Sequence, residues 1–281
     1  MSNRTRLFLA VVSAALAWAG AATARGLDDI KEKGELSVAV YRDFAPFSSR
    51  QGDKLAGVDV DLAQAIAKRM KLRLSVMELT AGDSVDDDLR NGVWKGHYLD
   101  HQTADVMLHI PTDRVFALRN TNVVILAPYF RERVVVARNP DKVLAKDDIT
   151  IFEQEKVGVE LATLADIYLT AQLGPKFVAN VVHFPTLAAA AQALAKGEVA
   201  AVMGTETELA AALGKNAQRF PLAPMDSPGL TKAGWELGLA VKDSNRELGH
   251  VLDDVMAGLK ADGTIAAIFR RHHLPYHPPE E

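Results

Sequence analysis

Short apolar runs alternate along this chain with longer segments in which apolar residues recur at helical spacing. Runs of the first kind predict buried strands, and segments of the second kind predict amphipathic helices. The predicted strands are 36–40, 72–79, 104–110, 123–129, 133–137, 157–160, 178–184, 199–203 and 237–242, and the predicted helices are 59–70, 85–91, 164–173, 187–196 and 248–259. Strands that alternate with helices of this length predict parallel sheets with crossover helices, which is an α/β fold.

Polar residues at the ends of several segments support the predicted helices. Thr163 and Asp166 have the Thr-x-x-acid spacing of a capping box, in which side chains satisfy free amides at a helix start. Thr186 is placed to cap the helix 187–196, and Gly197 is placed to end it, because glycine adopts the left-handed C-terminal conformation at little cost. These helices therefore have physical start and stop points as well as apolar periodicity.

The beginning of the chain predicts a targeting segment. Arg4 and Arg6 form a basic start, residues 7–19 form an apolar run, and Ala22-Thr23-Ala24 has the Ala-x-Ala form of a cleavage site. The apolar run is shorter than the roughly 20 residues that a membrane span needs. We expect residues 1–24 to be a signal peptide that is removed after Ala24, and the mature chain to be periplasmic. An uncleaved anchor is the alternative.

The composition narrows the class of protein. The chain has no cysteine, which excludes both disulfides and the N-terminal cysteine of a lipid-anchored exported protein. Cleavage after Ala24 leaves 257 residues, more than one compact core usually holds, so two lobes are expected. Removing Arg4 and Arg6 lowers the formal net charge from −4 to −6, which argues against a nucleic-acid partner.

The segment from Gly57 to Met70 has the order Gly-x-Asp-x-Asp-Leu-x-x-x-Ile-Ala. This order resembles the signature of the bacterial extracellular solute-binding proteins of family 3, with Val58 where the family usually has a larger residue. Residues 260–268, in which Gly263 is placed as the residue after a helix end, resemble the closing helix pair of the same family. The resemblance extends over most of the mature chain, from Leu36 to Leu274.

The resemblance implies a two-lobed periplasmic-binding-protein type II fold, in which each lobe is a mainly parallel sheet with flanking helices. The first lobe would be discontinuous, made of 25–129 plus 239–281, and the second would be 130–238. Two hinge strands would cross near 127–131 and 236–239. Clefts between lobes are common ligand sites, and hinge closure around a ligand is the expected motion.

The resemblance also implies ligand contacts from the first lobe. Arg114, which follows His109-Ile110-Pro111-Thr112-Asp113, is at the position where amino-acid binders of the family hold a carboxylate. A guanidinium offers bidentate geometry to a carboxylate, and a surface arginine paired with Asp113 is the alternative. Phe44 matches the aromatic that stacks over the ligand, with core packing as its alternative. His109 stands where the family has a small polar residue and is expected to alter the pocket.

In the second lobe, Thr163 matches a hydroxyl of the family's Gly-Val-x-x-Gly-Thr-Thr turn. A helix N-terminus is a natural anion site, and plain helix capping is the alternative. Thr205 is the candidate contact at the position where amino-acid binders have an aspartate for the ligand's ammonium group. Glu206 is one residue out of register and is expected to face away from the ligand. Burial of an ammonium group without its counter-charge is costly, so we do not expect a zwitterionic α-amino acid.

Residues 91–103 form a polar and aromatic insertion that is either a lid or partner-binding element beside the cleft or a surface excursion. Together with 127–131, it is similar to a branch of solute-binding-like proteins that are encoded beside periplasmic quinoprotein alcohol dehydrogenases. In this alternative, the chain assists the dehydrogenase and has no transport role.

We find no catalytic or metal-binding pattern to nominate. His97, His101 and His109 lack a metal-ligand spacing, and no nucleophile motif is present. We therefore expect no metal, no cofactor and no enzymatic activity. A dehydratase-type enzyme on the same fold is the least favoured alternative.

The sequence thus predicts a monomeric periplasmic solute-binding protein. It would capture a small, carboxylated ligand between Arg114, Phe44 and His109 of one lobe and Thr163 and Thr205 of the other. Its partner would be the membrane permease of an ABC-type transporter.

Overall fold

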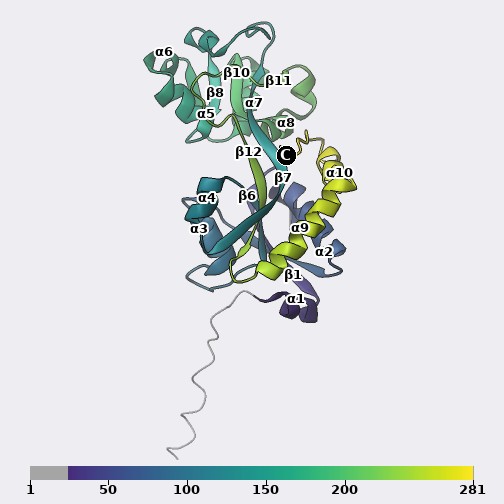
Figure 1. Ribbon diagram of the computed structural model, residues 1–281. Helices are drawn as coiled ribbons and strands as arrows, with labels where there is room; N and C mark the ends of the chain where they lie inside the picture. The colour runs from purple at the N-terminus through teal and green to yellow at the C-terminus, as the bar shows by residue number, and fades with distance from the viewer. Residues whose placement is uncertain (1–24, 281) are drawn as a thin grey trace, which may run out of the picture.

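Two long antiparallel strands, β7 (Val123–Arg138) and β12 (Gly234–Lys242), run through the molecule and join its two lobes (Figure 1). The computed structural model describes residues 25–280. The predicted signal peptide, residues 1–24, lies outside the described residues. Within the described range, no helix combines the length and the apolar character that a membrane crossing requires.

Lobe one, the lower lobe in Figure 1, is built on the sheet order β5-β1-β6-β12-β7. Strand β1 is parallel to both of its neighbours, whereas β12 is antiparallel to β6 and β7. Its other elements are α1 (Leu27–Lys33), β1 (Glu35–Tyr41), β2 (Asp43–Phe44), β3 (Ser48–Gln51), β4 (Lys54–Ala56), α2 (Val58–Arg69), β5 (Arg73–Leu79), α3 (Val85–Leu89), a π-helical turn (Arg90–Trp94), β6 (Val106–Pro111), α4 (Arg114–Arg119), α9 (Arg246–Ala261) and α10 (Thr264–Arg271).

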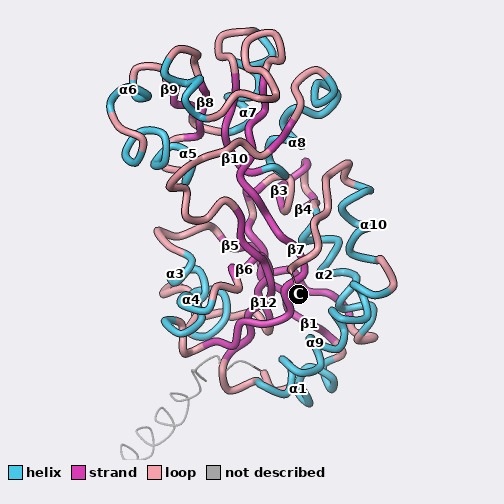
Figure 2. Tube along the Cα trace, turned by 45° about the horizontal axis from the view of Figure 1, so that its top comes forward, coloured by secondary structure: helices cyan, strands magenta, loops and turns pink. Residues whose placement is uncertain are grey.

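Lobe two continues the same sheet on the other side of the crossing strands, in the order β7-β10-β8-β9, with β11 also paired to β7. Helices flank its strands, as they do in lobe one (Figure 2). Its elements are a 3₁₀ turn (Ile149–Glu153), β8 (Val157–Glu160), α5 (Leu164–Ile167), a π-helical turn (Tyr168–Gln172), α6 (Pro175–Val178), β9 (Val181–Phe184), α7 (Leu187–Lys196), β10 (Ala201–Thr205), α8 (Glu206–Leu213), a 3₁₀ turn (Gly214–Gln218) and β11 (Leu222–Ala223).

The predicted two-lobed α/β class is confirmed, and most strands and helices form within a few residues of their predicted ends. The segment 178–184 is an exception, because the short helix α6 precedes a strand that begins only at Val181. The three-stranded sheet β2-β3-β4 was not predicted. Helices α9 and α10 share the core of lobe one with α2, although the assignment of exact lobe boundaries stays a prediction.

The predicted strands 123–129 and 133–137 form one continuous strand, β7, which includes Pro128. Leu126 pairs with Leu239 and Phe130 pairs with Leu237, so residues 127–129 bulge out opposite a single residue of β12. Proline lacks an N–H group and is tolerated at a bulge, where a ladder hydrogen bond is already missing. The bulge therefore lets the strand pass through Pro128 at the crossing between the lobes.

The facing residue in this bulge is Gly238. A Cβ atom there would lie 2.5 Å from the carbonyl oxygen of Leu126, so only glycine allows the two strands to approach this closely. Ala127 adopts a left-handed φ of 51°, which is uncommon for a residue other than glycine. The crossing strands thus have an irregular backbone where the lobes meet.

The N-terminus of α2 docks on the segment before β3. The amide of Asp59 donates to the carbonyl oxygen of Phe47 at 2.8 Å, and the amide of Val58 donates to that of Pro46 at 3.2 Å. The two acids of the motif do more than begin a helix: Asp59 is buried and accepts a hydrogen bond from Tyr129, and Asp61 lies 2.8 Å from Nε2 of His272. This motif therefore ties α2 to β7 and to the C-terminal helices.

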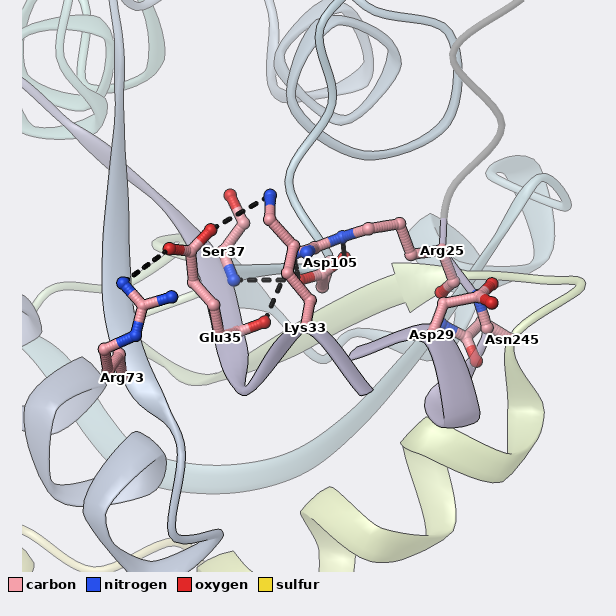
Figure 3. A network of polar contacts seen from close by, with 9 residues as sticks. Arg25, Asp29, Lys33, Glu35, Ser37, Arg73, Asp105 and Asn245 are labelled. Atoms are coloured by element: carbon pink, nitrogen blue, oxygen red, sulfur yellow. Dashed lines mark hydrogen bonds and ion pairs between the residues drawn. The ribbon is translucent and has the colours of Figure 1, made fainter. Parts of the chain in front are cut away.

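A polar network fixes the first described residue to lobe one (Figure 3). The Arg25 guanidinium forms an ion pair with the buried carboxylate of Asp105, which also accepts a hydrogen bond of 2.8 Å from the amide of Ser37. Asn245, before α9, donates to the carbonyl oxygen of Arg25 at 2.8 Å. Burial raises the pKa of Asp105, while the hydrogen bond from Arg25 acts in the opposite direction. The network thus connects the N-terminal segment of lobe one to the start of α9.

The tail after α10, residues 272–280, passes beside the crossing strands and contacts both lobes. Tyr276 donates from its hydroxyl to the carbonyl oxygen of Tyr129 at 3.0 Å, and the amide of Arg131 donates to the carbonyl oxygen of His277 at 2.9 Å. The His277 ring lies 2.8 Å from the carboxylate of Glu206, at the start of α8 in lobe two. We call residues 275–280 the C-terminal strap.

We predict that Gly57→Ala destabilises the mature chain by about 3 kcal/mol or more. Gly57 has a φ of 143°, and a Cβ atom there would lie 2.2 Å from the carbonyl oxygen of Phe47. Urea denaturation measures the effect. The matched control is Gly52→Ala, whose φ is 63° in open space, with an expected cost of about 1 kcal/mol. Equal costs for the two variants would contradict the close docking of α2.

Candidate functional site

Three cavities lie where the lobes face each other. The largest, about 580 Å³, is lined by lobe one together with Trp235. A second, about 310 Å³, lies in lobe two, and a third, about 420 Å³, is lined by both lobes. Trp235 borders the first two, Phe44 the first and third, and Glu208 the second and third. Because the cavities share these walls, we treat them as one interlobe cleft.

Aromatic rings form the wall of the cleft on lobe one. The ring of Phe44 stacks on Phe47 at a centroid distance of 5.2 Å and meets the edge of His109 at 4.9 Å. Tyr41 contacts Phe44 edge to face at 5.9 Å. Trp235 packs against the cores of both lobes, so its indole stands at their junction. The wall is a preformed apolar surface, suited to the body of an organic molecule.

The structure brings His109 and Phe44 together at the cleft, where both were expected. His109 adopts a left-handed φ of 64° at the end of β6, and its Nδ1 atom lies 3.2 Å from a carboxylate oxygen of Asp59. The hydroxyl of Tyr129 donates to the other oxygen of Asp59 at 3.1 Å. The buried Asp59 and Tyr129 side chains therefore hold the imidazole of His109 on the side of the protein core, and the rest of the ring lines the largest cavity.

Thr163 and Thr205 line the lobe-two cavity. Thr163 caps α5: its hydroxyl donates to the carbonyl oxygen of Glu160 at 2.7 Å and accepts from the amide of Asp166 at 3.4 Å. The predicted capping bond is thus present, and the Thr163 hydroxyl already makes two hydrogen bonds within the protein. Thr205 donates from its hydroxyl to the carboxylate of Glu208. A role for either threonine in ligand binding stays a prediction.

Glu206 faces away from the cleft, as its position in the sequence implies. Its carboxylate is 6% exposed and lies 3.0 Å from Nη2 of Arg133 and 2.8 Å from the ring of His277. Burial alone would raise the pKa of Glu206, but the hydrogen bonds from Arg133 and His277 outweigh it and lower the pKa. Glu206 is therefore a structural link between α8, β7 and the C-terminal strap.

Among the carboxylates that border the cleft, Glu208 lines two of the three cavities and was not predicted from the sequence. Burial raises its pKa, and the nearby Glu160 acts in the same direction. Thr205 and Glu208 have the Thr-x-x-Glu spacing of a capping box, a signal that could have placed Glu208 beside Thr205. Glu160 also borders the cleft, but one of its oxygens accepts from the amide of Leu187 at 2.9 Å, at the start of α7.

Arg114, the candidate for carboxylate binding, is the first residue of α4 and is exposed. It does not border any of the three cavities described above. The preceding Asp113 caps α4 and forms an ion pair with Lys232 at 2.9 Å. The basic side chain that does line the largest cavity is Arg42, and it lies 3.3 Å from the carboxylate of its neighbour Asp43. Carboxylate binding by Arg114 stays a prediction.

The insertion 91–103 begins with the π-helical turn and continues as an exposed loop. Tyr98 and Leu99 at its tip are 75% and 74% exposed. The loop is held at its base by the amide of Ala104, which donates to the carbonyl oxygen of Gly92 at 2.8 Å. Its function as a lid or as a partner-binding element stays a prediction. Across residues 25–280, no group of three or more His, Asp or Glu side chains has the geometry of a metal site.

Two lobes joined by two crossing strands thus enclose the cleft, in the arrangement that the sequence predicted. Residues 36–95 match the family described as bacterial extracellular solute-binding proteins, family 3. The L-cystine-binding protein TcyJ of Escherichia coli K12 is 25% identical over 248 residues, covering 86% of this chain and 84% of TcyJ. The chain is therefore similar to this family over residues 36–95 and to TcyJ over most of its length.

Solved structures share the fold. An ancestral cationic amino acid solute-binding protein, AncCDT-1, superposes with a TM-score of 0.67 at 20% identity, covering 87% of this chain and 97% of that one. An amino acid ABC transporter substrate-binding protein from Streptococcus pneumoniae, bound to L-arginine, gives 0.61 at 23% identity, with 89% and 98% covered. These relatives are named as binding proteins, in agreement with the prediction that the chain is not an enzyme. The quinoprotein-associated branch stays a prediction.

We predict that Glu206→Gln lowers the free energy of unfolding by about 2 kcal/mol at pH 7, because charge-assisted hydrogen bonds to Arg133 and His277 are weakened. A carboxylate whose pKa is lowered on folding stabilises the protein above its ordinary pKa and loses this effect as the pH falls. The difference should therefore shrink at pH 4 in urea denaturation. The control is Glu153→Gln, an exposed acid of lobe two that lies 3.9 Å from Lys176. A cost independent of pH would rule out this ionic role.

Proposed function

We propose that the chain captures a small organic solute in the interlobe cleft and presents it to the membrane permease of an ABC-type transporter in the periplasm. The observation that carries this proposal is the set of three cavities that share Phe44, Trp235 and Glu208 at the junction of the lobes. A ligand that contacts both lobes favours the closed form, because only that form makes all of its contacts.

The irregular crossing strands support closure of the lobes. The bulge at 127–129 and the close approach at Gly238 lie where β7 and β12 pass from one lobe to the other. Hinges are commonly a few residues that absorb a change in backbone angles while the packed lobes move as units. Trp235 contacts both cores and would therefore change its surroundings when the lobes move.

The relatives support a transport partner. The S. pneumoniae protein is named as an ABC transporter substrate-binding protein, and TcyJ as an L-cystine-binding protein. We propose export through the predicted signal peptide, with the mature chain starting at Arg25. A carboxylated ligand would be bound by Arg114. This residue is exposed on α4, so its guanidinium would reach a ligand at the mouth of the cleft only after a movement of the lobes or of α4.

We predict that a bound solute shifts the fluorescence of Trp235. Cleavage after Ala24 leaves Trp94 and Trp235 as the tryptophans of the mature chain, so Trp94→Phe makes Trp235 the single reporter. Screens of amino acids, carboxylates and amines should give one class that both shifts the emission and raises the melting temperature, since a ligand that binds the folded state stabilises it. Small-angle scattering of the same complex should show a more compact particle. If no solute of any class has these effects, solute capture is refuted.

The carboxylate hypothesis has its own test. If a carboxylated solute binds through Arg114, then Arg114→Ala should weaken that binding by at least about tenfold, because a bidentate charge-assisted contact is lost. Isothermal titration measures the affinity, and Arg119→Ala, an exposed arginine of the same helix that pairs with Asp86, is the control. Undiminished binding in Arg114→Ala would remove Arg114 from the site.

A further inference from the structure

Glu132 is a buried carboxylate that the fold does not neutralise. It lies on β7 between the lobes and is 2% exposed. Its Oε1 atom accepts from the amide of Arg133 at 2.9 Å, but its Oε2 atom is buried without a hydrogen-bond partner among residues 25–280. An unpaired buried carboxylate oxygen is costly, so this atom favours a further donor. The hydroxyl of Thr207 on α8 is close enough to lower the pKa of Glu132, but this hydroxyl is also buried without a hydrogen bond of regular geometry.

The register of the crossing strands directs Glu132 toward the cleft. Glu132 pairs directly with Trp235 of β12. Directly paired residues on antiparallel strands place their side chains on the same face of the sheet. Trp235 borders two of the cavities, and Glu132 lies on the same face of the neighbouring strand, although Glu132 itself does not line any of the three cavities described above.

The charged groups around Glu132 come from three elements. Glu208 of α8 is close enough to disfavour its ionisation, and His109 of β6 acts in the opposite direction from lobe one. From its own strand, Arg133 turns its guanidinium toward Glu206. The guanidinium of Arg133 is nevertheless close enough for the Glu132 carboxylate to contribute to raising the pKa of Arg133.

We propose that the cleft binds an organic ammonium ion, whose charged head lies between Glu132 and Glu208 and whose apolar body packs on Phe44, Tyr41 and Trp235. This inference rests on the proposed function and specifies the solute class. An ammonium group donates three hydrogen bonds and carries the positive charge that complements two carboxylates without an ion-pair partner among residues 25–280. Aromatic rings at the same place add a favourable cation–π surface. A carboxylate on the ligand is not required for this contact.

The proposal includes a proton linkage. Burial raises the pKa of Glu132 to about 7, so near neutral pH this group is partly protonated before binding. An ammonium ion favours the ionised carboxylate, and binding therefore releases a proton. Affinity for the amine should fall by about tenfold from pH 8 to pH 6, since below the pKa each unit of pH costs a factor of ten in the ionised fraction.

The probes are three primary amines and the acids of the same skeletons: ethylamine with propionate, 2-phenylethylamine with 3-phenylpropionate, and tryptamine with indole-3-propionate. L-Phenylalanine and L-tryptophan add the zwitterions. At millimolar concentration, at least one amine should bind by isothermal titration while its matched acid does not. If only acids or only zwitterions bind, or if no amine binds, the ammonium inference is wrong. Binding of an acid or a zwitterion would still leave the proposed solute capture standing.

The carboxylates are tested with Glu132→Gln and Glu208→Gln, each expected to weaken amine binding by at least about tenfold. Glu198→Gln, an exposed acid of lobe two that lies 3.9 Å from Lys196, should bind normally. Glu132→Gln should also raise the melting temperature of the empty protein at pH 8, because it removes a buried charge. Weaker binding together with a more stable fold separates a lost contact from misfolding. Normal affinity in both variants overturns the proposal.

The pH series assigns the proton. Amine affinity should lose its dependence on pH in Glu132→Gln and keep it in His109→Asn. Asparagine is the matched replacement at position 109, because it tolerates the left-handed φ of 64° found there. Titrations in buffers of different ionisation enthalpy should detect proton release on binding. A dependence that disappears only in His109→Asn would assign the linkage to the histidine and contradict the role of Glu132.

Discussion

The pairing of β7 with β12 is the constraint on which the rest of the molecule depends. These two strands belong to both halves of the sheet, so each lobe is completed by the same pair. Their ladder is regular inside each lobe and broken by the bulge at 127–129, opposite Gly238. The position of the cleft follows from this arrangement, because Trp235 and Glu132 lie on the stretch of ladder just beyond the bulge.

The cleft combines two surfaces of different origin. Lobe one supplies rings that are held rigidly by the Phe44–Phe47 stack and by the buried contact of His109 with Asp59. Lobe one also supplies the carboxylates of Asp43, Asp83 and Asp88 to the largest cavity. Lobe two supplies Glu160, which is satisfied by a helix start, and Glu208, which has a hydroxyl as its partner. Because polar groups come from both lobes, a ligand is recognised in full only when both contribute.

Local patterns predicted the elements well and long-range contacts poorly. The capping residues Thr163 and Thr186 act as predicted, because a cap depends on residues three positions away. The continuity of β7 across the two strands predicted separately was missed, because the bulge at Pro128 depends on the register with a strand more than a hundred residues later. Glu132 carried no local signal at all: its burial, its missing partner and its direction arise from strand pairing and from groups on β6 and α8. The family resemblance therefore located the interlobe cleft, but it did not predict which carboxylates give the cleft its charge.

The C-terminal strap has a practical consequence for handling this protein. Because Tyr276 and His277 contact β7 and α8, the chain does not leave the molecule at a free corner of lobe one. An affinity tag or a fluorophore attached after Glu281 would begin one residue beyond the junction of the lobes, where the Arg131 side chain lies 3.2 Å from the Glu280 carboxylate. A fluorophore at this position would report a movement of the lobes, whereas a purification tag there would lie against the contacts between them.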